Sequence, residues 1–216
     1  MVLAGGIVCI MTAFKILALS LLGSLALHAE EEGEFANMFN GKDLSGWQTT
    51  GNWVVEDGMV TLKPRPGESG WQRYDAYLST TRKYKDFVID LDFKFNAQGN
   101  SGVFFHVGDL KDHVTSGIEV QILDTYGKEN VGHHDCGGVI RTVGPIKNMV
   151  KPAGEWNHYT ITVKNKLLTV VLNGEQIVDI DLATSEMKDR PAEGYISFQD
   201  EAKPVWYRNV RIKELK

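Results

Sequence analysis

Cysteine is scarce in this chain of 216 residues, which contains only Cys9 and Cys136. Cys9 precedes an apolar run at residues 16–27, and removal of that run as a leader would leave Cys136 alone. A single thiol cannot form an internal disulfide, so stability must come from the core and the hydrogen-bonded backbone. We expect Cys136 to be a small buried apolar residue, which is the usual environment of a lone thiol.

Runs of basic residues are also absent, and the formal net charge is −5. Neither nucleic acid nor an anionic membrane surface is therefore expected as a partner. The hydrophobic content of 43% is ordinary for a globular domain. The only extended apolar run is too short to span a bilayer, so no membrane association is expected once it has been removed.

That apolar run has the pattern of a secretory signal, because Lys15 precedes it and "LHA" and three glutamates follow it. We predict a signal peptide over residues 1–29, with Met11 as an alternative start, and a single catalytic domain over residues 30–216. The protein is then expected to be exported, to the periplasm or to the medium.

Helical periodicity longer than two turns is missing from residue 50 onward, where short alternating runs are separated by turn residues. In "DFVIDLDFKF" five apolar side chains alternate with polar ones, as in a strand with one wet face. Asp57-Gly58, Asn165-Lys166 and Asn173-Gly174 mark hairpin turns. We predict ten to twelve strands in an all-β, two-sheet antiparallel sandwich of the jelly-roll type.

Within this pattern, "GIEVQILD" at residues 117–124 places polar side chains where a buried strand would be apolar. Glu119 and Gln121 share one face, and Asp124 joins them only if a β-bulge shifts the phase. Two carboxylates at a similar spacing serve as nucleophile and acid/base in retaining β-glucanases of the laminarinase type, about 5–5.5 Å apart. The alternative is a solvated strand face with Asp124 starting a turn.

The segment "NAQGNSGVFFHV" at residues 96–107 is the expected neighbour of that strand, because only a short loop separates the two. Glycines flank Asn100 and Ser101, and glycine in a strand often marks close approach of another group. His106 is expected to share a face with Phe104 and to lie near Glu119; the alternative is a packed histidine.

Further candidates lie in loops and at strand ends. His133 and His134 are competent metal ligands, but adjacent residues cannot all face one ion, so a single ligand joining Glu119 or His106 competes with a plain surface loop. Aromatic and polar side chains on an exposed sheet face suit sugars. The expected sugar-binding residues are Asn100, Ser101, Gln121, Gln199, Arg82, Lys83 and Tyr126.

Seven blocks in order resemble the 3-keto-disaccharide hydrolase domain over roughly residues 35–215: "FNGKDLSGW", "NSGVFFH", "GIEVQILD", "KPAGEWNHYTI", "LNGEQIVD", "GYISFQD" and "YRNVRIKEL". The resemblance implies a concanavalin-like jelly roll of exported bacterial proteins that act on glycosides oxidised to a ketone at C3, by hydrolysis or by a lyase step. Some members use a divalent metal. The family commonly has Arg in place of His106, and His-Gly in place of Glu201-Ala202.

The resemblance also implies a chemistry, because a C3 ketone acidifies the C2 proton and one base then starts cleavage. Glu119 or His106 is the expected base, and Gln121, His133 or a bound divalent cation polarises the ketone; the cation's ligands would be His133, His134 and Glu119. Asp124 binds a hydroxyl or orients a histidine. A laminarinase-like retaining glucanase and a non-catalytic carbohydrate-binding module remain as alternatives.

Overall fold

The computed structural model describes Met1 and residues 33–216, and residues 33–216 lie in one compact unit. Apart from Met1, the predicted signal peptide lies outside the described residues and stays a prediction. Within the part of the chain that is described, no helix combines the length and apolar character needed to cross a membrane.

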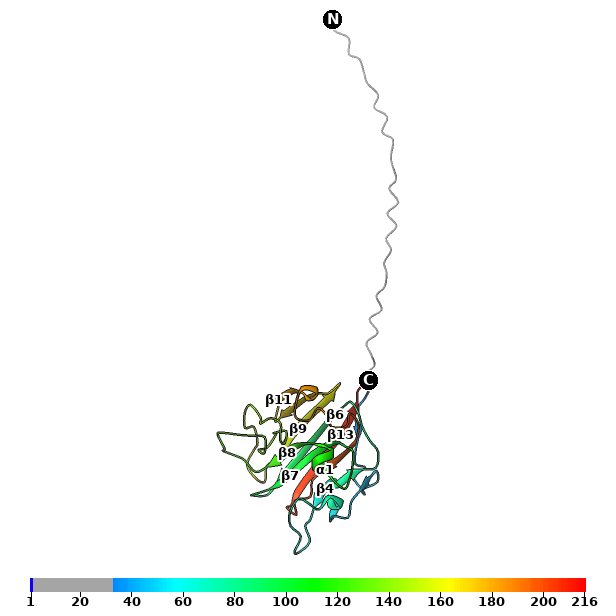
Figure 1. Cartoon of the computed structure of the whole chain (residues 1–216), viewed down its shortest axis with the longest axis vertical. Helices are drawn as coiled ribbons and strands as arrows, with labels where there is room; N and C mark the ends of the chain where they lie inside the picture. Colours follow the sequence, from blue (N-terminus) through cyan, green and yellow to red (C-terminus); the bar gives the residue numbers. More distant parts are fainter. Residues whose placement is uncertain (2–32) are drawn as a thin grey trace. The chain divides into compact units, whose positions relative to one another are not determined.

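Two antiparallel sheets form the domain, as the alternation predicts (Figure 1). The larger sheet has the order β11-β10-β9-β6-β13-β4-β3, with β1 also paired to β13, and the smaller has the order β2-β5-β12-β7-β8. The larger sheet comprises β1 (Ala36–Asn37), β3 (Trp53–Glu56), β4 (Met59–Leu62), β6 (Phe87–Phe95), β9 (Asn157–Lys164), β10 (Leu167–Leu172), β11 (Glu175–Asp181) and β13 (Val205–Glu214). The smaller comprises β2 (Trp47–Gln48), β5 (Leu78–Thr80), β7 (Asn100–Val107), β8 (Ile118–Leu123) and β12 (Tyr195–Phe198).

Helical structure in the described residues is limited to α1 (His113–Ser116) and two 3-10 turns, Tyr74–Ala76 and Leu182–Thr184. The short helix α1 lies across β7 and β8 in Figure 1, in the connection between these two strands. It therefore covers part of the smaller sheet's outer face.

The core fills the space between the sheets with the alternating apolar side chains of the strands. On β6, Phe87, Ile89, Leu91, Phe93 and Phe95 are all buried, as predicted. Their burial, with that of the facing strands, is the main stabilising contribution in a domain whose described part has one free cysteine and no disulfide.

The three predicted hairpin turns are confirmed by backbone angles. Asp57-Gly58 has φ of 50° and 73°, Asn165-Lys166 has 51° and 65°, and Asn173-Gly174 has 53° and 86°. Two consecutive residues with positive φ give the turn whose twist matches that of paired strands. The sequence thus located these hairpins correctly.

Trp47 and Cys136 are both buried, and for Cys136 this is the environment expected of a lone thiol. Trp47 stacks on Phe39 and Phe198 with ring centroids 4.5 and 5.4 Å away. The Cys136 side chain is 1% exposed, and burial raises the pKa of its thiol to about 11. Neither residue is available to a ligand.

The outer face of the larger sheet pairs its polar groups internally. His158 lies between two carboxylates, with Nδ1 2.8 Å from Asp92 and Nε2 3.1 Å from Asp90. Arg208 and Arg211 donate to the same two carboxylates at 3.0 and 2.9 Å. This face is therefore stabilised by its own ion pairs.

Candidate functional site

The smaller sheet differs from the larger one because polar atoms on its outer side are buried without partners. Among the described residues, three such oxygens belong to Asn100, Glu119 and Gln199. An unpaired buried polar atom costs about 1–3 kcal/mol, so several in one place indicate groups held ready for a ligand. These three side chains line one hollow.

Glu119 lies on the floor of this hollow, on β8 opposite Phe104 of β7. Its side chain is 7% exposed, and Oε1 has no hydrogen-bond partner. Gly102 provides the room, because a Cβ at that position would lie 2.3 Å from Glu119 Oε1. The glycine noted in the sequence is needed for this close approach.

The hollow around Glu119, called here the Glu119 hollow, has a volume of about 260 Å³. Its walls combine planar amides, ionisable groups and one indole: Trp71, Asn100, Val114, Glu119, Gln121, His134, Ile140, Arg141, Gln199 and Glu201. Amides and carboxylates bind hydroxyls, and an aromatic face packs on the apolar face of a sugar ring. The composition therefore suits a carbohydrate.

Burial makes the Glu119 carboxyl a weaker acid than an exposed one. Removal from water raises the pKa of its carboxyl to about 8, and the charge of Glu201 acts in the same direction. The nearby Arg141 guanidinium opposes this shift and lowers the pKa. A carboxyl with a pKa near neutrality is a suitable general base.

The loop after β8 carries Arg141 and His134 to the hollow by pairing with the free edge of that strand. Ile140 N–H donates to the Glu119 carbonyl at 3.1 Å, and Gly137 N–H donates to the Gln121 carbonyl at 2.9 Å. Arg141 has a φ of 62°, and its N–H donates to Nδ1 of His133 at 3.0 Å. His133 therefore fixes the backbone that presents Arg141.

Asp124 does not join Glu119, and His106 does not lie beside it, so both expectations are wrong. The reason is that the β-bulge lies in another strand than expected. Strands β7 and β8 pair without a register shift, so no bulge turns Asp124 toward Glu119. Asp124 instead accepts from Gln98 N–H at 2.9 Å in the preceding turn. The bulge lies in β7, because Phe104 and Val107 are three residues apart while their partners on β12, Ser197 and Tyr195, are two apart.

His106 sits in that bulge with a φ of 51°, which rotates its ring out of the face shared by Phe104. Nε2 donates to the carbonyl oxygen of Lys85 at 2.6 Å, and the ring packs edge-on to Phe87. Burial lowers the pKa of His106. It is the packed histidine of the alternative interpretation.

The structure also separates several expected sugar-binding residues from the Glu119 hollow. Ser101 faces the core and donates to the Gln199 carbonyl at 2.8 Å. Arg82 pairs with Glu214 at 2.6 Å, Lys83 lies over the Tyr195 ring, and Tyr126 is exposed outside the hollow. Of the expected set, Asn100, Gln121 and Gln199 line it.

The expected metal ligands do not assemble. His134 lines the Glu119 hollow, but Nδ1 of His133 is occupied by the Arg141 N–H. In the described part of the chain, no three His, Cys, Asp or Glu side chains are placed to hold an ion. The residues present do not fit a resident divalent metal.

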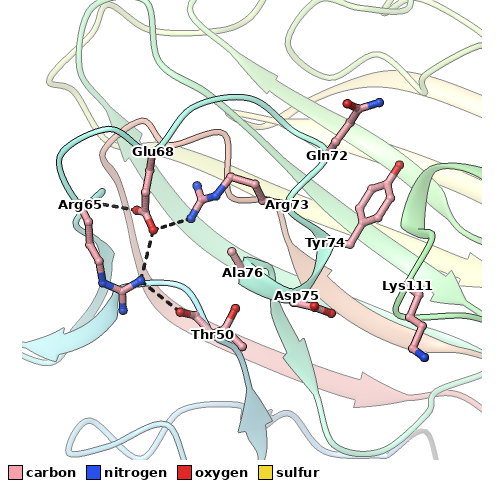
Figure 2. A pocket seen from close by; sticks show the side chains of 9 residues that line it. All are labelled: Thr50, Arg65, Glu68, Gln72, Arg73, Tyr74, Asp75, Ala76 and Lys111. Atoms are coloured by element: carbon pink, nitrogen blue, oxygen red, sulfur yellow. Dashed lines mark hydrogen bonds and ion pairs between the residues drawn. The ribbon is translucent and has the colours of Figure 1, made fainter.

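A larger hollow of about 580 Å³ lies beside the first, and Figure 2 shows its walls. Arg65 and Arg73 converge on Glu68 there, while Gln72, Tyr74 and Lys111 lie on the other side. We call it the Gln72 hollow.

Sequence reasoning missed Arg141, Trp71 and the placement of Glu201 in the hollow. Arg141 is a loop residue whose position depends on a left-handed backbone angle. Trp71, 39% exposed, lies in a glycine- and proline-rich segment without periodicity. In the sequence, Glu201 is marked only by its departure from the His-Gly that the family commonly has at this position.

Comparison with known proteins agrees with a carbohydrate site. A family model described as a 3-keto-alpha-glucoside-1,2-lyase-like domain matches residues 34–213. A 3-keto-disaccharide hydrolase of Bacteroides thetaiotaomicron is 24% identical, with 90% of this chain and 82% of the relative covered.

Solved structures extend the comparison. A proposed glycosyl hydrolase from Parabacteroides distasonis is 28% identical with a TM-score of 0.71, covering 85% of this chain and 94% of the other. The carbohydrate-binding module CBM66 from Bacillus subtilis is 13% identical with a TM-score of 0.56, covering 78% and 96%, and shares the fold alone.

Proposed function

This chain belongs to the 3-keto-alpha-glucoside-1,2-lyase-like domain family, and from that premise we propose that it cleaves glycosides whose C3 hydroxyl has been oxidised to a ketone. The observation that carries the proposal is the buried carboxyl of Glu119 on the floor of a polar hollow, where its Oε1 has no hydrogen-bond partner. A site built around one strong base suits proton abstraction beside a carbonyl.

The reaction begins when ionised Glu119 removes the proton on C2, and the electron pair of the C2–H bond forms an enolate with its charge on O3. Collapse of the enolate restores the ketone, makes a C1–C2 double bond and breaks the bond from C1 to the leaving oxygen. Addition of water across that double bond would give net hydrolysis. Glu119 suits the first step because its pKa, raised by burial to about 8, makes it a stronger base than an exposed carboxylate.

We assign Arg141 the role of stabilising the negative charge of the enolate. It lines the same hollow as Glu119, and its guanidinium carries a permanent positive charge with several donors. Charge that develops on O3 would be stabilised by these donors, the contribution that is usually largest in such sites.

We assign Glu201 as the general acid, which donates a proton to the leaving oxygen. Burial raises the pKa of Glu201, which favours the protonated carboxyl that a general acid needs. The amides of Asn100, Gln121 and Gln199 would bind sugar hydroxyls, and Trp71 would pack on the ring.

Incubation with paired disaccharides, one oxidised at C3 and one not, tests this function by mass analysis of the products. We expect cleavage of the oxidised sugar alone, with and without a chelator. A retaining glucanase would cleave the unoxidised sugar, and a binding module would cleave neither.

The retaining glucanase is kept as a second candidate because two carboxyls, Glu119 and Glu201, line one hollow. The same product analysis separates it from the keto-specific enzyme. Asp124, which the sequence suggested as the second carboxyl of a retaining glucanase, has no role in this candidate mechanism.

We also propose export, on the basis of the charged and apolar pattern of the first 29 residues. Fractionation of the native host followed by N-terminal sequencing would test it. Recovery of the full-length chain from the cytoplasm alone would refute it.

A further inference from the structure

The Gln72 hollow adjoins the Glu119 hollow at residues 71–73. Trp71 lines the Glu119 hollow, and the next residue, Gln72, lines the larger one. The segment after β12 provides a second link. Arg73 of the larger hollow donates to Asp200 at 3.1 Å, and the chain neighbours of Asp200, Gln199 and Glu201, line the Glu119 hollow. The walls of the two hollows therefore meet at residues 71–73.

Fixed hydrogen bonds build this hollow, although much of it is loop. Glu68 accepts from Arg73 at 2.7 Å and from the backbone N–H of Arg65 at 2.7 Å (Figure 2). Arg65 also donates to the Thr50 carbonyl at 3.2 Å. The anchor is Asp200, whose side chain is fully buried and keeps one oxygen without a partner. Such a network holds the walls before any ligand arrives.

The charges of the hollow are balanced within its own walls. Glu68 and Asp200 offset the two arginines. Lys111 and Asp75 add one charge of each sign and form no ion pair within the described residues. A phosphate or carboxylate would meet no net positive charge here, whereas a neutral ligand rich in hydroxyls would find donors, acceptors and the ring of Tyr74.

We propose that the Gln72 hollow binds the leaving-group side of the substrate as a sugar unit, with Gln72 and Lys111 as its contacts. The inference rests on the proposed function, because the reacting sugar occupies the Glu119 hollow. A volume of about 580 Å³ lies within the range of ~300–1,000 Å³ found for small-molecule sites. The substrate is thus an oligosaccharide, selected at both ends of the cleaved bond.

The test compares two substrates, a 3-keto-disaccharide and a methyl 3-keto-glucoside that has no second sugar. Gln72→Ala and Lys111→Ala remove exposed side chains, so both variants should fold. Lys188→Ala, an exposed lysine that lines neither hollow, is the matched control. Each hollow variant should lower kcat/KM for the disaccharide about fivefold, the cost of one lost hydrogen bond. The methyl glycoside should react as with the unaltered protein.

Two results overturn the inference: an unchanged kcat/KM for the disaccharide, or an equal fall for both substrates. If the unaltered protein cleaves neither 3-keto substrate, the proposed function fails, and calorimetric titration with the 3-keto-disaccharide still decides the binding site. Weaker binding by Gln72→Ala and Lys111→Ala than by Lys188→Ala supports the site, and equal binding refutes it.

Discussion

Replacement of Glu119 by Gln should make the protein more stable at alkaline pH. The pKa of the Glu119 carboxyl lies at about 8 in the folded protein, against an ordinary value of 4.5. Between these values the unfolded chain ionises this group while the folded chain keeps it protonated. The folded state therefore binds more protons, and the free energy of unfolding falls as pH rises through this window.

The size of the effect follows from the two pKa values. Each pH unit across the window contributes about 1.4 kcal/mol, so the full penalty is about 5 kcal/mol as an upper limit. Glu119→Gln cannot ionise and escapes the penalty, although its buried amide adds a fixed cost of about 1–3 kcal/mol. The difference in stability between variant and unaltered protein should thus grow from pH 5 to pH 8 and then level off.

Urea unfolding at several pH values measures this difference, and Glu129→Gln, which removes an exposed carboxylate, is the control. Activity should change in the opposite direction from stability, because kcat/KM for a 3-keto-glycoside rises as Glu119 ionises toward pH 8. A stability difference that does not vary with pH would refute the assignment of a buried, protonated Glu119.

Other substitutions test the neighbours of this carboxyl. Gly102→Ala should displace Glu119. Overpacking should lower the free energy of unfolding by about 1–3 kcal/mol, and kcat should fall far more than this loss of stability explains. Steady-state rates and urea unfolding measure the two effects. Arg141→Met should lower kcat about 10²–10³-fold, the usual loss for a charge-stabilising donor, while Arg82→Met, outside the hollow, serves as its control; equal kcat for the two would contradict the role. Asp124→Asn should leave kcat unchanged, and a large loss would return Asp124 to the mechanism.

The fold could be predicted from the sequence because it depends on alternation and turn chemistry. Period-two patterning placed Phe87 and its strand in the core, and Asn173-Gly174 signalled a turn through its preference for positive φ. The same alternation put Glu119 and Gln121 on one face, where both line the hollow. Regular strands therefore yielded the floor of the candidate site.

The walls of the site could not be predicted in this way, because they depend on irregular backbone. One extra residue in β7 turned His106 away, and no local signal distinguishes a bulge there from the bulge expected in β8. Arg141 reaches the hollow only through a left-handed backbone angle held by His133. Tertiary pairing of that loop with β8 decides its position.

The most direct measurement of the central claim uses a 3-keto-glycoside carrying deuterium at C2. If Glu119 removes that proton in the step that limits kcat/KM, the deuterated substrate is cleaved more slowly by the unaltered protein, and Glu119→Gln cleaves neither form. Equal rates for the two substrates, together with retained cleavage by Glu119→Gln, would contradict the account.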